Sequence, residues 1–150
     1  MRLQYLTLSL ICCFQFPCTV NAQSIVGNWK TIDDVSGEAK SVLTIKEADG
    51  VYSASVAEIL DPEVKDINPL CLECPGDKRN TPIKGLDIMW DVKSTGKSKW
   101  GKGKIMDPEN GKVYGCKLSL MTKDKLKVRG FIGFAALGRN QYWYRVYAPE

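Results

Sequence analysis

The residue pattern that most resembles a reactive or metal-binding site in this sequence is the cysteine pair of Cys71-Leu72-Glu73-Cys74. Such a pair can close a structural disulfide, exchange disulfides through a reactive thiolate, or supply two of the four ligands of a zinc ion. A thiolate would gain from Lys78 and Arg79, but no βαβ pattern of the thioredoxin type surrounds the pair. Zinc would need further ligands from Cys116 or nearby carboxylates. A structural disulfide is therefore expected, and thiol exchange and metal binding remain alternatives.

The sequence contains no histidine. This absence removes the usual general base, the Ser-His and Cys-His nucleophile pairs, and every zinc site that needs imidazole. The spacing Ser94-x-x-Lys97 matches a Ser-Lys hydrolase motif, but it lies in a Gly-containing loop and not on a helix. The sequence therefore predicts a protein that is not an enzyme, with no catalytic residue and no cofactor.

The clusters of acidic and basic residues are better explained by turns and by a solvent-exposed surface than by catalysis or metal binding. Adjacent Asp33 and Asp34 would point to opposite faces of an extended chain, so they are expected to be turn residues, as is Asp107 before Pro108. Alternation places Lys125, Lys127 and Arg129 on a solvated outer face. An anionic envelope surface, such as lipid head groups, is the sharper alternative, whereas no nucleic-acid partner is expected.

The first residues are expected to be a secretory signal peptide. A short positive start is followed by the apolar stretch 3–14 and by small residues at the cleavage positions of Val20-Asn21-Ala22. Removal of residues 1–22 would leave a single domain, residues 23–150, with Cys71, Cys74 and Cys116 in an oxidising compartment. The formal net charge of +4 would fall only by the charge of Arg2.

The remaining chain has the rhythm of an all-β domain, because Gly, Asp and Asn turn signals recur between runs of alternating apolar residues. Asp49-Gly50 is typical of a tight hairpin, and Asp107 to Gly111 of a longer turn. Cys116 shares its parity with apolar neighbours and is expected to be a small buried side chain. The pattern predicts strands over 25–32, 41–47, 51–60, 86–92, 100–106, 112–120, 125–132 and 141–147.

About eight consecutive antiparallel strands predict a closed up-and-down barrel, since closure removes the two exposed edges of an open sheet; a two-sheet sandwich is the alternative. Gly27-x-Trp29 near the start and Trp143-x-Arg145 near the end resemble lipocalin-like barrels. In those barrels an early Trp closes one end and a late Arg packs across it. Arg145 is accordingly expected to close the barrel.

The sequence resembles a bacterial exported family known as domain of unknown function 2147. The resemblance rests on matches in the same order along nearly the whole chain after residue 22, including Cys71-Leu72-Glu73-Cys74, Val128-Arg129-Gly130-Phe131-Ile132-Gly133 and Leu137-Gly138-Arg139-x-Gln141-x-Trp143. It implies a calycin-like barrel and location in the periplasm, with the extracellular space as the alternative. The family brings no established activity.

Eight-stranded barrels either fill their interior with side chains or keep one ligand cavity. We expect a non-enzymatic barrel that binds a small apolar or lipid-like ligand. A solid structural or partner-binding envelope protein is the first alternative, and a thiol or metal site at the Cys pair is the second. Strand parity predicts a set of inward-facing side chains, namely Trp29, Leu43, Ile45, Ile88, Trp90, Tyr114, Leu118 and Trp143. The candidate ligand-binding residues are Trp29, Trp90, Tyr114, Arg129, Arg139, Trp143 and Arg145.

Overall fold

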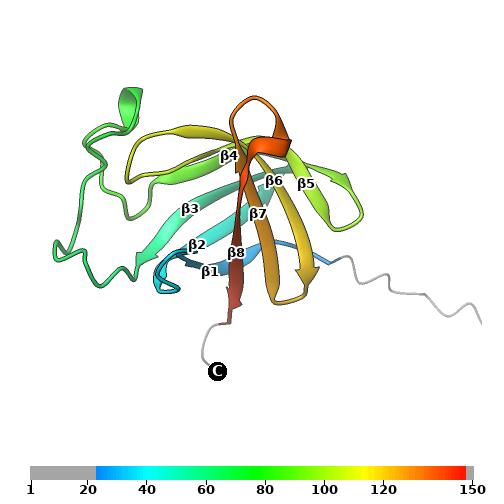
Figure 1. Cartoon of the computed structure of the whole chain (residues 1–150), viewed down its shortest axis with the longest axis horizontal. Coiled ribbons are helices and arrows are strands. Elements are labelled where there is room, and N and C mark those ends of the chain that lie inside the picture. The colour runs from blue at the N-terminus through cyan, green and yellow to red at the C-terminus, as the bar shows by residue number, and fades with distance from the viewer. Residues whose placement is uncertain (1–22, 148–150) are drawn as a thin grey trace, which may run out of the picture.

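The computed structural model describes residues 23–147, so the predicted signal peptide lies outside the described residues. Eight antiparallel strands follow one another around a closed barrel, which confirms the predicted fold (Figure 1). Two short 3-10 helices, η1 (Gly76–Lys78) and η2 (Ala135–Leu137), lie in the connections. The strands are β1 (Gly27–Ile32), β2 (Ala39–Ala48), β3 (Val51–Ile59), β4 (Asp87–Gly96), β5 (Lys99–Met106), β6 (Val113–Thr122), β7 (Lys125–Phe131) and β8 (Arg139–Val146).

Closure comes from the pairing of the first strand with the last. Trp29 is opposite Arg145, and Thr31 is opposite Trp143, in the antiparallel β1–β8 ladder. Every strand therefore has two neighbours, and no edge is left to pair with another chain. The predicted strand positions are confirmed, although β2 and β4 are longer than the alternation indicated.

The barrel has one closed end and one open end. The tight turns β2–β3, β4–β5 and β6–β7 lie at the closed end, together with residues 23–26. Asp49 and Gly50 both have positive φ, 51° and 78°, as the predicted hairpin turn requires. The opposite end, called the mouth below, is formed by the connections 33–38, 60–86, 107–112 and 132–138. The connection 60–86 extends beyond the barrel in Figure 1, in green.

Arg145 and Trp29 build the closed end, as the sequence predicted. The Arg145 guanidinium lies 4.2 Å from the centroid of the Trp29 ring and donates hydrogen bonds to the carbonyls of Ser24, Val26 and Lys123. Trp29 is fully buried, and its Nε1 donates to the carbonyl of Ile25 over 2.8 Å. The segment 23–26 is thus fixed across the end of the barrel.

The core lies inside the barrel and is continuous with the packing of Trp29. Leu43, Ile45, Leu118 and Trp143 are buried, as strand parity predicted. Cys116 is also fully buried, and burial raises the pKa of its thiol to about 12. The further buried apolar residues include Ala54, Val56, Met89, Val92, Met106, Leu126 and Val128. Among residues 23–147, no helix is long and apolar enough to span a membrane.

The period of two fails along β4. The β3–β4 ladder shifts register twice between Tyr52 and Ser55, and Asp91 has a φ of 57°. A shift of one residue moves side chains to the opposite face of the sheet. Met89 and Val92 are consequently fully buried, whereas Trp90 is only half-buried and has Lys78 of η1 5.4 Å from its ring centroid. The expectation that Trp90 faces the interior of the barrel needs this correction.

Candidate functional site

A cavity of about 350 Å³ occupies the mouth half of the barrel. Its size is within the range of small-molecule sites, roughly 300–1,000 Å³. Its lining includes exposed residues such as Glu109 and Arg139, so the cavity opens to solvent. The apolar part of the lining comes from strands all around the barrel and includes Leu43, Val56, Ile88, Ile105, Val128 and Trp143.

Uncharged polar groups interrupt this apolar lining at a few points. Thr31 and Ser41 share a hydrogen bond of 2.9 Å between their hydroxyls, and the Ser41 amide donates to Thr31 Oγ1. Trp143 Nε1 lies 3.4 Å from Gln141 Oε1. Tyr114 also faces the cavity, and no hydrogen bond of its hydroxyl occurs within residues 23–147. Few polar groups in a mostly apolar wall are typical of sites for small apolar ligands.

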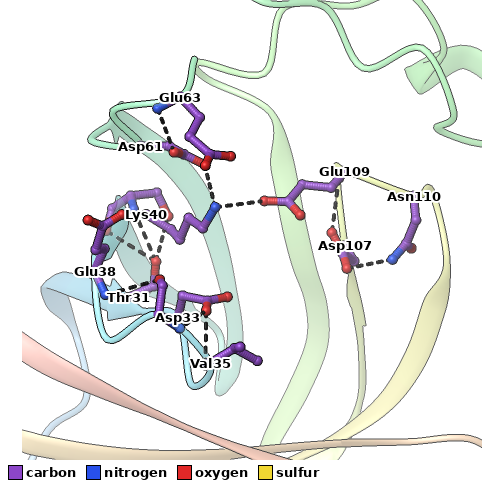
Figure 2. Close-up of polar contacts among 12 residues, drawn as sticks. Thr31, Asp33, Val35, Glu38, Lys40, Asp61, Glu63, Asp107, Glu109 and Asn110 are labelled. Carbon is purple, nitrogen blue, oxygen red and sulfur yellow. Dashed lines mark hydrogen bonds and ion pairs between the residues drawn. The ribbon is translucent and has the colours of Figure 1, made fainter.

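Lys40 connects two sides of the mouth. Figure 2 shows its ammonium group between Asp61, at 2.5 Å, and Glu109, at 3.9 Å. Asp61 Oδ1 also accepts the amide of Glu63. The Lys40 ammonium lowers the pKa of Asp61 below its usual value, and the hydrogen bond to Asp61 raises the pKa of Lys40. This ion pair therefore connects the start of β2 to the first residues of the 60–86 connection, at the opening of the cavity.

A second ion pair joins the start of β8 to the neighbouring β1–β2 turn at the mouth. The Arg139 guanidinium binds both carboxylate oxygens of Asp34, with Nε donating to Oδ2 over 2.6 Å. This bidentate contact lowers the pKa of Asp34 and raises that of Arg139. Asp33 accepts the amides of Val35 and Ser36, which lowers the pKa of its carboxyl group and confirms its predicted turn role.

These shifts predict how pH acts on the Lys40–Asp61 pair. A lowered Asp pKa stabilises the fold above the ordinary value of 3.8 and ceases to do so as the pH falls through the folded-state value. A raised Lys pKa stabilises the fold below pH 10.5 and ceases to do so as the pH rises through the folded-state value.

We expect Lys40→Met to lower Tm by a few degrees at neutral pH. Thermal unfolding across pH should show this difference vanish at both extremes; a constant difference would contradict it.

The 60–86 connection carries the cysteine pair and covers one side of the mouth. Cys71 and Cys74 form a disulfide, which confirms that prediction, and both are buried. Cys71 Sγ lies 3.1 Å from the carbonyl oxygen of Pro108 in the β5–β6 turn. A Cβ at Gly111, whose φ is 67°, would lie 1.7 Å from the Glu73 carbonyl oxygen. The disulfide loop and the β5–β6 turn therefore fit closely together.

The three cysteines of residues 23–147 should not react with a thiol reagent in the folded protein. Two are joined, and Cys116 is buried with a raised pKa. We expect native titration at pH 8 to give the same thiol count for the wild type and Cys116→Ala, and denatured titration to differ by one. Any thiols of residues 1–22 are present equally in both proteins, so they do not affect the difference between the two counts. Native reaction of Cys116 would contradict this expectation.

Three of the seven predicted ligand residues line the cavity: Tyr114, Arg139 and Trp143. Trp29 and Arg145 are at the closed end, and Trp90 lies beneath η1. Arg129 is outside the cavity lining and holds the β7–β8 connection through the carbonyls of Ala135 and Ala136. The role of these residues in a ligand site stays a prediction.

Sequence reasoning missed the charged groups of the opening. Lys40, Asp61 and Glu109 were not among the predicted site residues, although all line the cavity. The pairs Lys40–Asp61 and Arg139–Asp34 join residues distant in the sequence. The β2–β3 ladder brings Lys40 and Asp61 together, and the β1–β8 closure brings Asp34 and Arg139 together. Both pairings depend on strand register, so no local spacing could have indicated them. Within the described part of the chain, no group of three or more Cys, Asp or Glu side chains could hold a metal ion.

Comparison with known proteins agrees with this architecture. A family described as "Uncharacterized protein conserved in bacteria (DUF2147)" matches residues 27–145. No curated protein sequence matches the chain. Among solved structures, the chain is similar to protein HP1028 from the human pathogen Helicobacter pylori, described as belonging to the lipocalin family. The identity is 20%, the TM-score is 0.72, and the match covers 83% of this chain and 84% of that one. At this identity the likeness shows a shared fold.

Proposed function

Because the chain belongs to the bacterial family DUF2147 and has a lipocalin-like barrel, we propose that it is a binding protein for a small, mostly apolar ligand. The observation that carries this proposal is the open cavity with its apolar wall. Trp143 and the aliphatic side chains would contact the apolar part of the ligand. Tyr114, which lines the cavity, would orient the ligand through its hydroxyl, and Arg139 lies at the opening.

Burying apolar ligand surface in this cavity would supply the binding energy. Each square ångström of apolar surface removed from water contributes roughly 25 cal/mol. A ligand that filled the cavity would contact Leu43, Val56 and Val128, which are already buried and fixed by the barrel. Because the site is largely preformed, its side chains lose little conformational entropy when the ligand binds. A cavity of about 350 Å³ selects one small ligand over a bulky one.

A non-enzymatic role is part of the proposal. The described residues offer no reactive thiol, because Cys71 and Cys74 are joined and the pKa of Cys116 is raised. Lys40 and Arg139, the two cations of the lining, each pair with a carboxylate. Paired cations of this kind are suited to shaping an opening and poorly suited to acting as a base or nucleophile.

We also propose that the protein is exported to the periplasm after cleavage behind Ala22. A disulfide is typical of oxidising compartments, and the bacterial family supports this location. Export to the extracellular space is the alternative outcome. The mass and the cell fraction of the purified protein test both points, since a chain that starts at Gln23 lacks residues 1–22.

A partner-binding role is the second candidate. The 60–86 connection exposes apolar side chains, with Ile67 98% and Leu72 59% accessible. Such exposure at a protein surface is typical of contact with another molecule. The open cavity favours the ligand-binding role over a solid barrel.

Native mass spectrometry of the protein purified from its own compartment separates these roles. A ligand-binding barrel should carry an extra mass that organic extraction removes, and the extract should contain a small apolar compound. Bare protein before and after extraction, with no small molecule taken up from the compartment's lipid extract, would overturn the proposal. Co-purification of a stoichiometric protein partner with an empty cavity would favour the partner-binding role.

A further inference from the structure

The connection between β7 and β8 exposes large apolar side chains at the mouth. Ile132, Phe134 and Leu137 are 69%, 80% and 83% accessible, and the segment 132–138 contains no charged residue. Figure 1 shows this segment, in orange, projecting from the end of the barrel. Single exposed apolar residues are common, but three within six residues form a patch that favours contact with an apolar environment.

The segment is held in this exposed position. Arg129 donates to the carbonyls of Ala135 and Ala136, and also to Asn140 Oδ1 over 2.9 Å. A Cβ at Gly138 would lie 2.4 Å from the Gly130 carbonyl oxygen, so the backbone approaches β7 closely. These contacts fix the backbone while the apolar side chains point away from the core. A fixed exposed patch loses little conformational freedom when it meets a partner.

The wall of the barrel next to this segment is cationic. The five neighbouring strands β5, β6, β7, β8 and β1 each carry Lys or Arg and contain no Asp or Glu. Lys125 lies 4.5 Å from the ring centroid of Tyr142 and 5.6 Å from that of Tyr144, and both rings are partly exposed. The wall lysines, so called below, are Lys30, Lys99, Lys102, Lys104, Lys117, Lys125 and Lys127.

We propose that this face docks on the surface of an anionic phospholipid bilayer. Ile132, Phe134 and Leu137 enter the interface between head groups and acyl chains, and the wall lysines of β6 and β7, Lys117, Lys125 and Lys127, contact the anionic head groups. Tyrosines such as Tyr142 and Tyr144 suit the same boundary, because their rings are apolar and their hydroxyls are polar. Apolar insertion and charge attraction together provide the two signals that stable surface binding requires.

The acidic residues of the mouth set the orientation. Asp33, Asp107 and Glu109 line the opening, and an anionic surface repels them. The barrel therefore lies on its β6–β8 side, with the β7–β8 connection inserted and the opening beside the membrane. Docking in this way does not require a ligand in the cavity, so it stands apart from the proposed ligand-binding function.

Flotation with lipid vesicles tests the apolar contact. We expect the protein to bind vesicles of phosphatidylcholine with phosphatidylglycerol, and the double variant Phe134→Ser, Leu137→Ser to bind at least tenfold more weakly, on the order expected for two lost apolar side chains. The control is Val35→Ser, Ile67→Ser, which removes equally exposed apolar residues from other mouth segments. The wild type and all variants are compared with the same N-terminus, either all with residues 1–22 or all without them. Equal weakening by both double variants, or by neither, would overturn the proposal.

The charge contact has its own test. Lys125→Gln, Lys127→Gln should weaken binding to the anionic vesicles about tenfold or more, given about fivefold per lysine near a charged surface. Lys65→Gln, Lys84→Gln, which lie on the 60–86 connection, should leave it unchanged. Binding should fall as salt rises and should be weak on pure phosphatidylcholine. Equal binding to neutral and anionic vesicles would contradict the proposal. If variants that no longer bind vesicles still carry a ligand in the cavity, membrane docking and ligand binding are separate functions.

Discussion

Replacing Trp29 by alanine is expected to lower the free energy of unfolding by about 3–5 kcal/mol. Trp29 is fully buried, its Nε1 donates to Ile25, and its ring is the platform for Arg145. Truncation leaves a cavity at the closed end and removes the support of segment 23–26 as well. Against a total stability of roughly 5–15 kcal/mol for a typical domain, this single change brings the barrel close to unfolding.

The control for this prediction is Trp90→Ala. It removes the same side chain from a half-buried position outside the cavity lining. Chemical denaturation of both variants should show a much larger loss for Trp29 than for Trp90. Arg145→Lys should fall between them, because lysine keeps the charge but cannot donate to three carbonyls in the fixed arrangement of the guanidinium. Equal losses for Trp29 and Trp90 would show that the closed end is not the stabilising feature proposed here.

Much of this closed end could be predicted from the sequence. Alternation along the strands and the Asp49-Gly50 turn are local signals, because each depends on residues adjacent in the chain. Trp29 and Arg145 were linked only through the resemblance to lipocalin-like barrels, and the β1–β8 pairing confirms that link. Burial of Cys116 also followed from its parity on a strand.

The remainder depended on register, which local patterns do not contain. The shifts between Tyr52 and Ser55 reverse the face of residues along β4, so parity placed Trp90 inside. The ion pair between Asp34 and Arg139 required the closed barrel, since these residues are 105 positions apart and meet through the β1–β8 pairing. Arg129 could not be assigned from its neighbours, because its role lies in two carbonyl oxygens of the β7–β8 connection and the side-chain oxygen of Asn140 on β8.

Filling the cavity should abolish ligand binding while the barrel remains folded. Val128 lies on β7, is buried, and lines the cavity. We expect Val128→Trp to place an indole in the space that a ligand would occupy, because the cavity can receive the larger side chain without overpacking the core. The affinity for the neutral fluorescent probe N-phenylnaphthylamine should fall by at least about tenfold, since the probe would lose most of its buried apolar surface.

Lys127→Trp is the matched control, because it introduces the same side chain on the same strand but on the outer face, where Lys127 alternates with buried Leu126 and Val128. Its probe affinity should equal that of the wild type. Native mass spectrometry of both variants should give the same ordering for the natural ligand, with extractable mass retained in Lys127→Trp and lost in Val128→Trp. Equal probe binding by the two variants would place the probe outside the barrel. A folded Val128→Trp protein that keeps its extractable mass would show that the ligand does not occupy this cavity.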